Sequence, residues 1–558
     1  MDFSFFRTKK NNLKPVVLLS LDGFGIAPKS QGNAVARAHM PNFTQLQNQY
    51  PHTSLIASGE SVGLPANEVG NSEVGHLIMG VGRVILQKLK RINQSIESGE
   101  FFQNEAFLGA IGHIKRNQSH LHIMGLIGSG NVHASVAHLY ALIELCKRHD
   151  LKDVTFHLFT DGRDSPPRES LVLIEEIISR ISLAEVGQIG SLCGRYYAMD
   201  RDGRWQRTQK TYEMLVAAKG KTFESPQSVI AASYKDGLTD EFIEPSMVLD
   251  SNGKLHPIQD NDAVIFSNFR TDRPRQLTMA FVMPDFEHLH GFETQPDFKH
   301  GKKQVVKMSG PTFNRSKKLN NLFFVTMMEY QKNMPVSAVA FPFTIIDLPC
   351  SEVISQHNLP QLHLAESEKE TMVSYYFDGL RDTQFSQEDL IIIPSQKVPR
   401  YDKKPEMSVY GVADTLVRQL KRGKYPFVMM NFANPDMVAH TGNLAATIKA
   451  LEHTDKALGF VVAETLRQQG TLLITADHGN AEELLSYPQR SFFFTSEKGQ
   501  MNTDHSNNPV PFVAVRADWK SKQPRILKPG SLADIAPTIL ALLNLPVPSV
   551  MTGKNLLE

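Results

Sequence analysis

Residues 16–22 read VVLLSLD, an apolar run of strand length that ends in a carboxylate. Similar runs recur along the chain and alternate with stretches whose apolar residues repeat near the helical period of 3.6. This alternation is typical of parallel sheets covered by helices on both faces, so the sequence predicts an α/β fold. The other expected strands are residues 121–127, 154–159, 263–269, 322–327, 427–432 and 472–475, and the expected helices include residues 134–148 and 170–182.

Length and charge narrow the class of protein. The 558 residues would suffice for three or four domains of ordinary size. Lys and Arg together number 59 against 58 Asp and Glu, and this balance argues against a nucleic-acid-binding protein. The least regular stretch, Met283–Asn320, is rich in Lys, His, Pro and Gly, and we expect it to be a surface excursion.

The cysteines and the N-terminus bear on the compartment. Cys146, Cys193 and Cys350 are widely spaced and form no CxxC pair, so we expect neither a disulfide framework nor a structural zinc site. We therefore expect the protein to reside in a reducing compartment. The first residues, MDFSFFRTKKNNLK, do not resemble a signal peptide, and no run approaches 18 apolar residues. We therefore expect a cytoplasmic protein without membrane contact.

Three of the expected strands lead into metal-binding side chains. Ligands of open α/β sheets lie beyond the carboxyl ends of the strands, so these side chains should meet. Mixed carboxylate and imidazole donors suit Mn, Zn or Fe, and two such ions can clamp the oxygens of a phosphoryl transfer. The donors are Asp22, Asp436, His440, Asp477 and His478, with His505 in the polar loop NTDHSNNPVP.

Chance pairing is the alternative for any one of these pairs. The chain has 20 histidines, and a single Asp–His pair such as Asp477–His478 is more often a surface or capping feature than a ligand set. Metal-binding side chains follow three different strands, and this favours a site over chance. The carboxyl ends of the strands are where an α/β fold binds its ligands, whichever residues stand there.

The segment GNSEVGH, residues 70–76, supplies a candidate nucleophile. It precedes an apolar stretch and is typical of a loop that enters a helix, where unpaired backbone N–H groups favour an anionic oxygen. A nearby metal would lower the pKa of the Ser72 hydroxyl and activate it. The alternative is an ordinary serine N-cap, and the choice depends on the metal site.

A second set of strand ends supplies cations. Arginine presents a planar fork that suits carboxylate and phosphate, so a small anion would be held firmly there. The alternative is a set of exposed arginines paired with neighbouring aspartates. Asp164, among these cations, should stay ionised and could exchange a proton with a bound hydroxyl. The basic candidates are His133, Arg163, Arg195, Arg201, Arg270 and Arg273.

A glycine-rich turn between a strand and a helix argues against one cofactor. GLIGSG, residues 125–130, lacks the GxGxxG spacing, and no ribose-binding acid follows at the expected distance. A nicotinamide site is therefore not expected.

Taken together, the motifs resemble those of the cofactor-independent (2,3-bisphosphoglycerate-independent) phosphoglycerate mutases of the alkaline phosphatase superfamily. The resemblance spans nearly the whole chain. The motifs that carry it are LSLDGFGI, GNSEVGHLIMGVGR, TDGRDSPP, GRYYAMDRDGRW, NFRTDRPRQL, AESEK, KPEMS, NFANPDMVAHTGN, TADHGNAEE and NTDHSNNPVP.

The resemblance implies two α/β domains. An alkaline-phosphatase-like metal-binding domain would comprise residues 1–86 and 341–558, and an inserted transferase domain would comprise residues 87–340. It implies the interconversion of 3-phosphoglycerate and 2-phosphoglycerate in glycolysis and gluconeogenesis, in a cleft that closes between the domains. It also implies a monomer with two divalent metal ions, expected to be Mn²⁺.

The resemblance also implies a role for each matched residue. Ser72 would be the phosphorylated nucleophile and a metal ligand, Lys369 of AESEK would approach the transferred phosphate, and Asp164 would exchange protons with the glycerate hydroxyls. The substrate pocket would hold His133, Arg163, Asp164, Arg195, Arg201, Arg270 and Arg273. One metal would be held by Asp436, His440 and His505, and the other by Asp22, Asp477 and His478.

Two alternatives remain. Another superfamily member, a phosphatase or a phosphopentomutase, would share the metal site, but a plain hydrolase has no need for five arginines that retain a dephosphorylated acid. A non-catalytic relative would be marked by a lost ligand, and none is lost.

Overall fold

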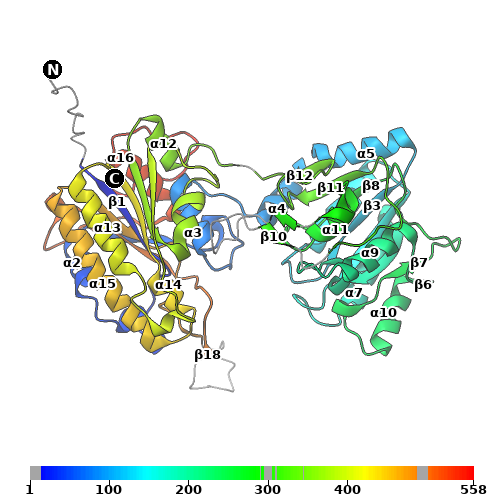
Figure 1. The fold of residues 1–558 in the computed structure, drawn as a ribbon, viewed down its shortest axis with the longest axis horizontal. Helices are drawn as coiled ribbons and strands as arrows, with labels where there is room; N and C mark the ends of the chain where they lie inside the picture. Colours follow the sequence, from blue (N-terminus) through cyan, green and yellow to red (C-terminus); the bar gives the residue numbers. More distant parts are fainter. Residues whose placement is uncertain (1–13, 290, 294–304, 308–310, 344, 487–499) are drawn as a thin grey trace. The chain divides into compact units, whose positions relative to one another are not determined.

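The computed structural model describes residues 14–558 except residues 290, 294–304, 308–310, 344 and 487–499. The described residues divide into two compact units. Unit 1 comprises residues 14–87 and 345–558, and unit 2 comprises residues 88–343. Each unit is built around its own eight-stranded sheet (Figure 1). The α/β fold class predicted from the sequence is confirmed.

The sheet of unit 1 is parallel over its first five strands. In spatial order these are β14 (Glu388–Ile393), β13 (Gln361–Glu366), β15 (Phe427–Phe432), β1 (Val16–Leu21) and β16 (Thr471–Thr475). All six residues of β1 are buried, as expected for a central strand covered on both faces.

The far edge of this sheet departs from the expected parallel pattern. β19 (Val510–Val515) runs antiparallel to both of its neighbours, β16 and β2 (His52–Ile56), and the short β20 (Gly530–Ser531) completes the edge. The sheet is therefore mixed. Apolar runs do not encode strand direction, which depends on the connection between strands, and an antiparallel edge on a parallel sheet is common.

Helices cover both faces of this sheet (Figure 1). On one side of β1 lie α2 (Pro41–Gln49), α13 (Val409–Arg422) and α15 (Leu444–Arg467), and on the other side lie α3 (Ser72–Val81), α12 (Cys350–Gln356) and α16 (Ile535–Leu542). The buried residues of α13, which include Val412, Leu416 and Leu420, form an apolar stripe that packs into the core. The polar side chains of the helix lie on the opposite, exposed side.

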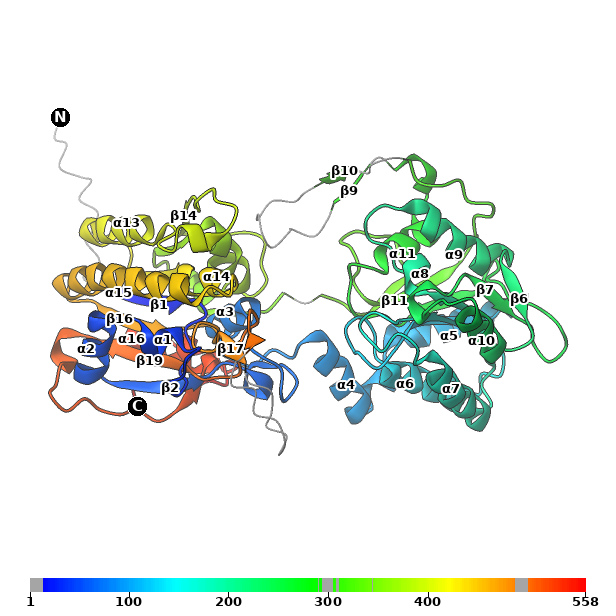
Figure 2. The same cartoon turned by 90° about the horizontal axis from the view of Figure 1, so that it is seen from below.

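Unit 2 repeats the design with a different strand order. Its sheet runs β12 (Ala338–Phe341), β11 (Phe323–Met328), β8 (Ala263–Phe266), β3 (Leu121–Ile127), β4 (Val154–Thr160), β5 (Gln188–Gly194), β7 (Ser246–Val248) and β6 (Lys221–Phe223). The first six strands are parallel, and β7 is antiparallel to β5. Figure 2 shows α9 (Trp205–Ala217) and α11 (Arg275–Val282) on one face, with α6 (Val136–Arg148) and α7 (Ser170–Ala184) on the other.

Other expectations can be compared with the structure directly. Each of the seven expected strands and both expected helices is present, with ends that differ by up to three residues. All three cysteines are buried and free. Part of the Met283–Asn320 stretch lies outside the described residues, and its described part includes the paired strands β9 (Gly291–Glu293) and β10 (Val305–Lys307). Within the described residues, no helix is long and apolar enough to cross a membrane.

Candidate metal centre and anion pocket

The acidic candidates gather at one edge of the unit 1 sheet. Asp22 follows β1, Asp477 and His478 follow β16, and Asp436 lies in α14 (Asn434–Ala439) just after β15. These three parallel strands are neighbours in register, with Val16 beside both Phe427 and Thr471, so their carboxyl ends coincide. The side chains of Asp22, Asp477 and His478 are fully buried.

Ser72 and Lys369 lie among these carboxylates. The Ser72 hydroxyl is 2.9 Å from Nε2 of His478 and 3.3 Å from Oδ1 of Asp22. Nζ of Lys369 donates to Oδ1 of Asp22 at 2.6 Å, to Oδ2 of Asp436 at 2.9 Å and to Oγ of Ser72 at 2.8 Å. Lys369 ends a short 3₁₀ turn directly after β13, so it reaches the centre from a fourth neighbouring strand end.

Ser72 owes its position to the start of α3. It is the first residue of the helix, and the side chain of Asn71 accepts a hydrogen bond from the Val74 N–H as the N-cap. The other early N–H groups of a helix have no intrahelical partner. The nucleophile candidate therefore lies where an anion on its oxygen is stabilised by backbone donors.

Three histidines are oriented in the same way. Nδ1 of His440 lies 2.8 Å from the Thr503 carbonyl, Nδ1 of His505 lies 2.8 Å from the Gly70 carbonyl, and Nδ1 of His478 lies 3.1 Å from the carbonyl of the next residue. Each Nδ1–H is thus the donor to a backbone oxygen, which leaves Nε2 to face the carboxylates. Metal-binding imidazoles are commonly held in this way.

The Nε2 atoms converge on Asp436. Nε2 of His440 is 3.3 Å from Oδ1 of Asp436, and Nε2 of His505 is 3.7 Å from the same oxygen. The two Nε2 atoms are 3.2 Å apart. Both nitrogens can ligate a cation that Asp436 also contacts.

Burial and charge set the protonation of this centre. Burial and the charge of Asp477 raise the pKa of Asp22 to about 6. Burial opposes ionisation of Asp436, but Lys369 and the hydrogen bond to His440 hold its pKa well below the usual range. The pKa of Lys369 is raised above its ordinary value despite burial, because Asp22 and Asp436 face it. The lysine is therefore a fixed cation among carboxylates at neutral pH.

The donor chemistry fits two divalent ions. Asp22, Asp477 and His478 place one ligand atom each within 4.8 Å of one another, and Asp436, His478 and His505 form a second such group. The first group matches the ligand set expected for one metal. The second group contains His478 where the expected ligand set has His440. His440 nevertheless contacts both Asp436 and His505.

Three polar residues of this centre were not among the predicted site residues. Asn431, in β15, donates to Asp22 at 2.7 Å, and Asn480 donates to Asp436 at 2.7 Å. His76 lies one helical turn after Ser72, and its Nδ1 is 3.3 Å from Asp477. The i, i+4 spacing of Ser72 and His76 is the sequence signal that could have identified it.

The basic candidates gather at the strand ends of unit 2. Nη1 of Arg195 is 2.6 Å from both Oδ1 of Asp161 and Oδ2 of Asp164, and Arg195 is buried. Burial alone would raise the pKa of Asp164, but the hydrogen bond and charge of Arg195 lower it. Asp164 is therefore ionised at neutral pH, as the sequence predicts.

Asp272, which the sequence analysis did not single out, links the other candidates. It pairs with Arg201 at 2.6 Å and with Arg270 at 3.2 Å, and it lies 3.7 Å from Nδ1 of His133. Burial and the charge of Arg195 lower the pKa of His133 to about 4, so its imidazole is neutral at pH 7. Asp272 stands in NFRTDRP, between two of the predicted arginines.

Two arginines lie differently. Arg273 donates to the backbone carbonyl of Met199 at 3.1 Å and has an Nε without a hydrogen-bond partner among the described residues. Arg163 is more than half exposed and pairs with Glu241 at 3.4 Å. Arg195, Arg201 and Arg270 are thus held by aspartates. Arg195 is buried, whereas Arg201 and Arg270 are nearly half exposed and Arg163 is more than half exposed.

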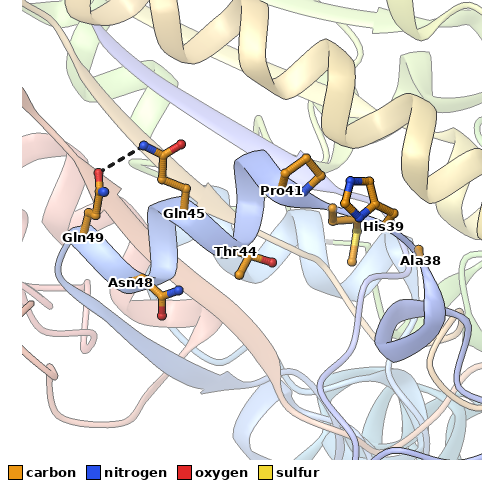
Figure 3. A pocket seen from close by; sticks show the side chains of 8 residues that line it. Ala38, His39, Pro41, Thr44, Gln45, Asn48 and Gln49 are labelled. Carbon is orange, nitrogen blue, oxygen red and sulfur yellow. Dashed lines mark hydrogen bonds between the residues drawn. The ribbon is translucent and has the colours of Figure 1, made fainter.

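A hollow of about 530 Å³ lies elsewhere on unit 1, along α2 (Figure 3). It contains none of the predicted site residues, and its polar side chains are three amides, one hydroxyl and one imidazole. We assign it no catalytic role. Its lining residues are Ala38, His39, Met40, Pro41, Thr44, Gln45, Asn48 and Gln49.

Comparison with known proteins gives a consistent result. A family model described as the N-terminus of BPG-independent PGAM matches residues 92–332. Proteins named 2,3-bisphosphoglycerate-independent phosphoglycerate mutase from Moorella thermoacetica, Chloroflexus aggregans and Clostridium botulinum are 41%, 42% and 43% identical. Each match covers 98% of this chain, and 98%, 98% and 99% of the respective relative.

A solved structure supports the same assignment. The phosphoglycerate mutase of Leishmania mexicana, determined at low cobalt concentration, is 27% identical with a TM-score of 0.60. The match covers 97% of each chain. Together with the full-length sequence matches, it shows that the chain belongs to the family of 2,3-bisphosphoglycerate-independent phosphoglycerate mutases.

Proposed function

We propose that this protein interconverts 3-phosphoglycerate and 2-phosphoglycerate through a phosphoserine on Ser72, without 2,3-bisphosphoglycerate. The observation that carries the proposal is the position of the Ser72 hydroxyl, at the N-terminus of α3 and within 3.3 Å of Asp22, His478 and Lys369. These surroundings suit a phosphorylated serine, because the start of a helix favours an anion and the Lys369 ammonium contacts the serine oxygen.

The residues of unit 1 would prepare the nucleophile. Asp22 lies close enough to accept the hydroxyl proton of Ser72, and Lys369 would neutralise an equatorial oxygen of the transferred phosphoryl group. Two divalent ions, proposed to be Mn²⁺, would lower the pKa of the serine and offset the phosphate charge. The residues that would hold them are Asp22, Ser72, Asp436, His440, Asp477, His478 and His505.

The residues of unit 2 would hold the rest of the substrate. A carboxylate suits the guanidinium forks, and displacing an aspartate partner leaves the arginine donors available to it. Asp164, ionised and 26% exposed, can exchange protons with the 2- and 3-hydroxyls of glycerate as the phosphoryl group changes oxygen. The pocket residues are His133, Arg163, Asp164, Arg195, Arg201, Arg270 and Arg273.

We further propose that these two tasks belong to separate domains, a metal-binding one of residues 1–86 and 341–558 and a transferase one of residues 87–340. The division into two compact units, each with its own sheet, supports this assignment. We also propose a cytoplasmic monomer acting in glycolysis. The three free, buried thiols suit a reducing compartment, and light scattering after size exclusion tests the monomer.

The decisive assay supplies 3-phosphoglycerate and Mn²⁺ without 2,3-bisphosphoglycerate and couples 2-phosphoglycerate to enolase. We expect activity in the wild type, loss of nearly all activity in Ser72→Ala, and little change in the control Ser30→Ala, which alters an exposed serine of the same unit. Undiminished activity of Ser72→Ala refutes the mechanism. Free phosphate as the main product favours a phosphatase, and activity that survives a metal chelator refutes the two-metal centre.

A further inference from the structure

A second cluster of potential ligands lies in unit 1, apart from the proposed metal centre. His363 is the third residue of β13, Glu388 is the first residue of β14, and Asp378 follows the π-helical turn Met372–Tyr376. In the parallel register Glu388 lies beside Gln361, two residues before His363, so both side chains project from the same face of the sheet. The topology therefore brings one imidazole and two carboxylates together.

The cluster is closed to solvent. The side chains of His363 and Glu388 are fully buried, and that of Asp378 is 2% exposed. Aromatic rings of Phe377 and Phe427 pack edge-on against the imidazole. This apolar lining makes unpaired charge expensive, because a carboxylate removed from water needs a compensating partner.

The ligand atoms of the cluster lack such partners. Among the described residues, neither ring nitrogen of His363 nor Oδ1 of Asp378 nor Oε1 of Glu388 makes a hydrogen bond of good geometry, although the Val373 backbone lies close to the imidazole and Asp378 lies close enough to Glu388 to share a proton. These are the atoms that face one another: Nδ1 of His363 is 3.8 Å from Oδ1 of Asp378 and 3.7 Å from Oε1 of Glu388. Buried polar atoms in native proteins are nearly always satisfied, so four in one cluster point to a missing partner.

Charge identifies the kind of partner. Among the described residues, no lysine or arginine lies within ion-pair distance of Asp378 or Glu388, and His363 is their one basic neighbour. Arg381, the cation nearest in sequence, pairs with Glu352 at 3.9 Å, and its charge acts on Asp378 only from a longer distance. A divalent cation would neutralise Asp378 and Glu388 together and accept the imidazole lone pair.

Geometry selects among divalent cations. All three ligand atoms lie within 4.8 Å of one another. Tetrahedral zinc, with bonds of about 2.0 to 2.1 Å to nitrogen and oxygen, needs donors roughly 3.3 Å apart, and a small inward shift from 3.7 and 3.8 Å achieves this. Ca²⁺ and Mg²⁺ prefer more ligands, all of them oxygen.

We propose that His363, Asp378 and Glu388 bind a structural Zn²⁺ ion that ties β13, β14 and the π-helical turn together. The cysteine count had argued against a structural zinc site, but that argument applies to thiolate ligands only. The ion would be distinct from the catalytic pair, since none of its ligands belongs to the proposed centre. Its function would be to hold the strand from which Lys369 departs.

Metal analysis with a background variant tests the proposal. In His440→Ala/His478→Ala, which removes catalytic ligands, we expect about one zinc per chain to survive equilibration with Zn²⁺ and desalting. Adding His363→Gln should abolish that zinc, whereas adding His357→Gln, which replaces an exposed histidine at the end of α12, should not. Absence of zinc from the background variant, or retention of zinc after His363→Gln, overturns the proposal.

A second measurement decides the matter if a variant fails to fold. Crystals of the wild-type protein grown with Zn²⁺ should show an anomalous difference peak at the zinc edge in contact with all three side chains. A map without that peak overturns the proposal and indicates that Asp378 and Glu388 instead share a proton. Neither measurement depends on catalytic activity, so failure of the mutase proposal and failure of the zinc proposal are distinguishable.

Discussion

At the residue scale, the proposed chemistry depends on buried charges held by specific partners. Lys369 is the clearest example, since one ammonium contacts two carboxylates and the candidate nucleophile. Few positions allow so many short contacts, because the lysine must enter from a strand end that neighbours the metal ligands. Arg195 has the equivalent position in unit 2, between Asp161 and Asp164.

Lys369→Met should lower kcat by roughly a hundred- to a thousand-fold, because it removes a cation preorganised for the transferred phosphoryl group. Lys369→Arg should not restore activity, since a planar fork cannot replace a compact ammonium among three acceptors. The enolase-coupled assay at saturating Mn²⁺ measures both. The control is Lys403→Met, an exposed lysine of the same unit. A kcat within threefold of wild type would contradict the assigned role.

The buried His138 should make the unfolding free energy of unit 2 depend on pH. It is buried in α6, with Nε2 bonded to Oδ1 of Asn93 at 2.9 Å, and burial lowers its pKa from 6.5 to about 4. The unfolded chain therefore binds the proton more tightly than the folded chain. The contribution of His138 to the free energy of unfolding is constant above about pH 6.5. It becomes increasingly unfavourable as the pH falls and levels off below about pH 4.

Between pH 7 and pH 5, His138 should cost unit 2 about 2 kcal/mol of unfolding free energy. His138→Gln removes the titrating group, so its urea midpoint should fall less over this interval than that of the wild type. Urea titrations followed by Trp205 fluorescence measure the difference. His288→Gln, which replaces an exposed histidine of unit 2, is the control. Identical pH dependence in His138→Gln and wild type would show that His138 is not responsible.

At the element scale, α3 positions the reaction centre through backbone contacts. Every residue of the helix except Glu73 is buried, so the helix packs on all sides. Gly75 lies against the loop after β16: a Cβ there would lie 2.4 Å from the backbone oxygen of Asp477. Glycine is therefore required for α3 to lie against the loop that carries two metal ligands.

Gly75→Ala should reduce activity by about a hundred-fold, because displacing α3 or the Asp477 loop by even an ångström disturbs the nucleophile relative to its partners. It should also weaken metal binding, measured by titration with Mn²⁺. Gly112→Ala is the matched control, since this glycine also lies in a helix and its added Cβ would meet only the flexible end of Arg116 at 3.3 Å. Wild-type activity in Gly75→Ala would show that the contact can relax.

At the scale of the whole molecule, the two units have separate hydrophobic cores. The core of unit 1 surrounds β1, and that of unit 2 surrounds β3 and β8. The chain's two tryptophans fall one in each unit, Trp205 in α9 and Trp519 after β19. Each can report the unfolding of its own unit once the other is replaced by phenylalanine.

Phe266→Ala should destabilise unit 2 by about 3 to 5 kcal/mol, because it removes a fully buried ring from β8. The urea midpoint reported by Trp205 should fall, while that reported by Trp519 should stay within error. Equal shifts of both midpoints would show that the two units unfold as one cooperative body.

The amino-acid sequence by itself determined the α/β class, the central strands and the start of α3. These features depend on local periods of apolar residues and on turn residues, which single segments encode. Placement of Asp22, Asp436 and Asp477 at one sheet edge also followed from the sequence, because the carboxyl ends of neighbouring parallel strands coincide. The roles of these residues came from a family resemblance and stay predictions.

Only the tertiary structure decided the contacts made across long sequence separations. Lys369 meets Asp22 from 347 residues away, Asp272 links residues of several loops, and β19 runs antiparallel to its neighbours. The cluster of His363, Asp378 and Glu388 could not be predicted from the sequence either, because no local pattern indicates that three scattered residues are buried neighbours. Packing of distant elements sets such distances, and a linear pattern records periodicity but not proximity.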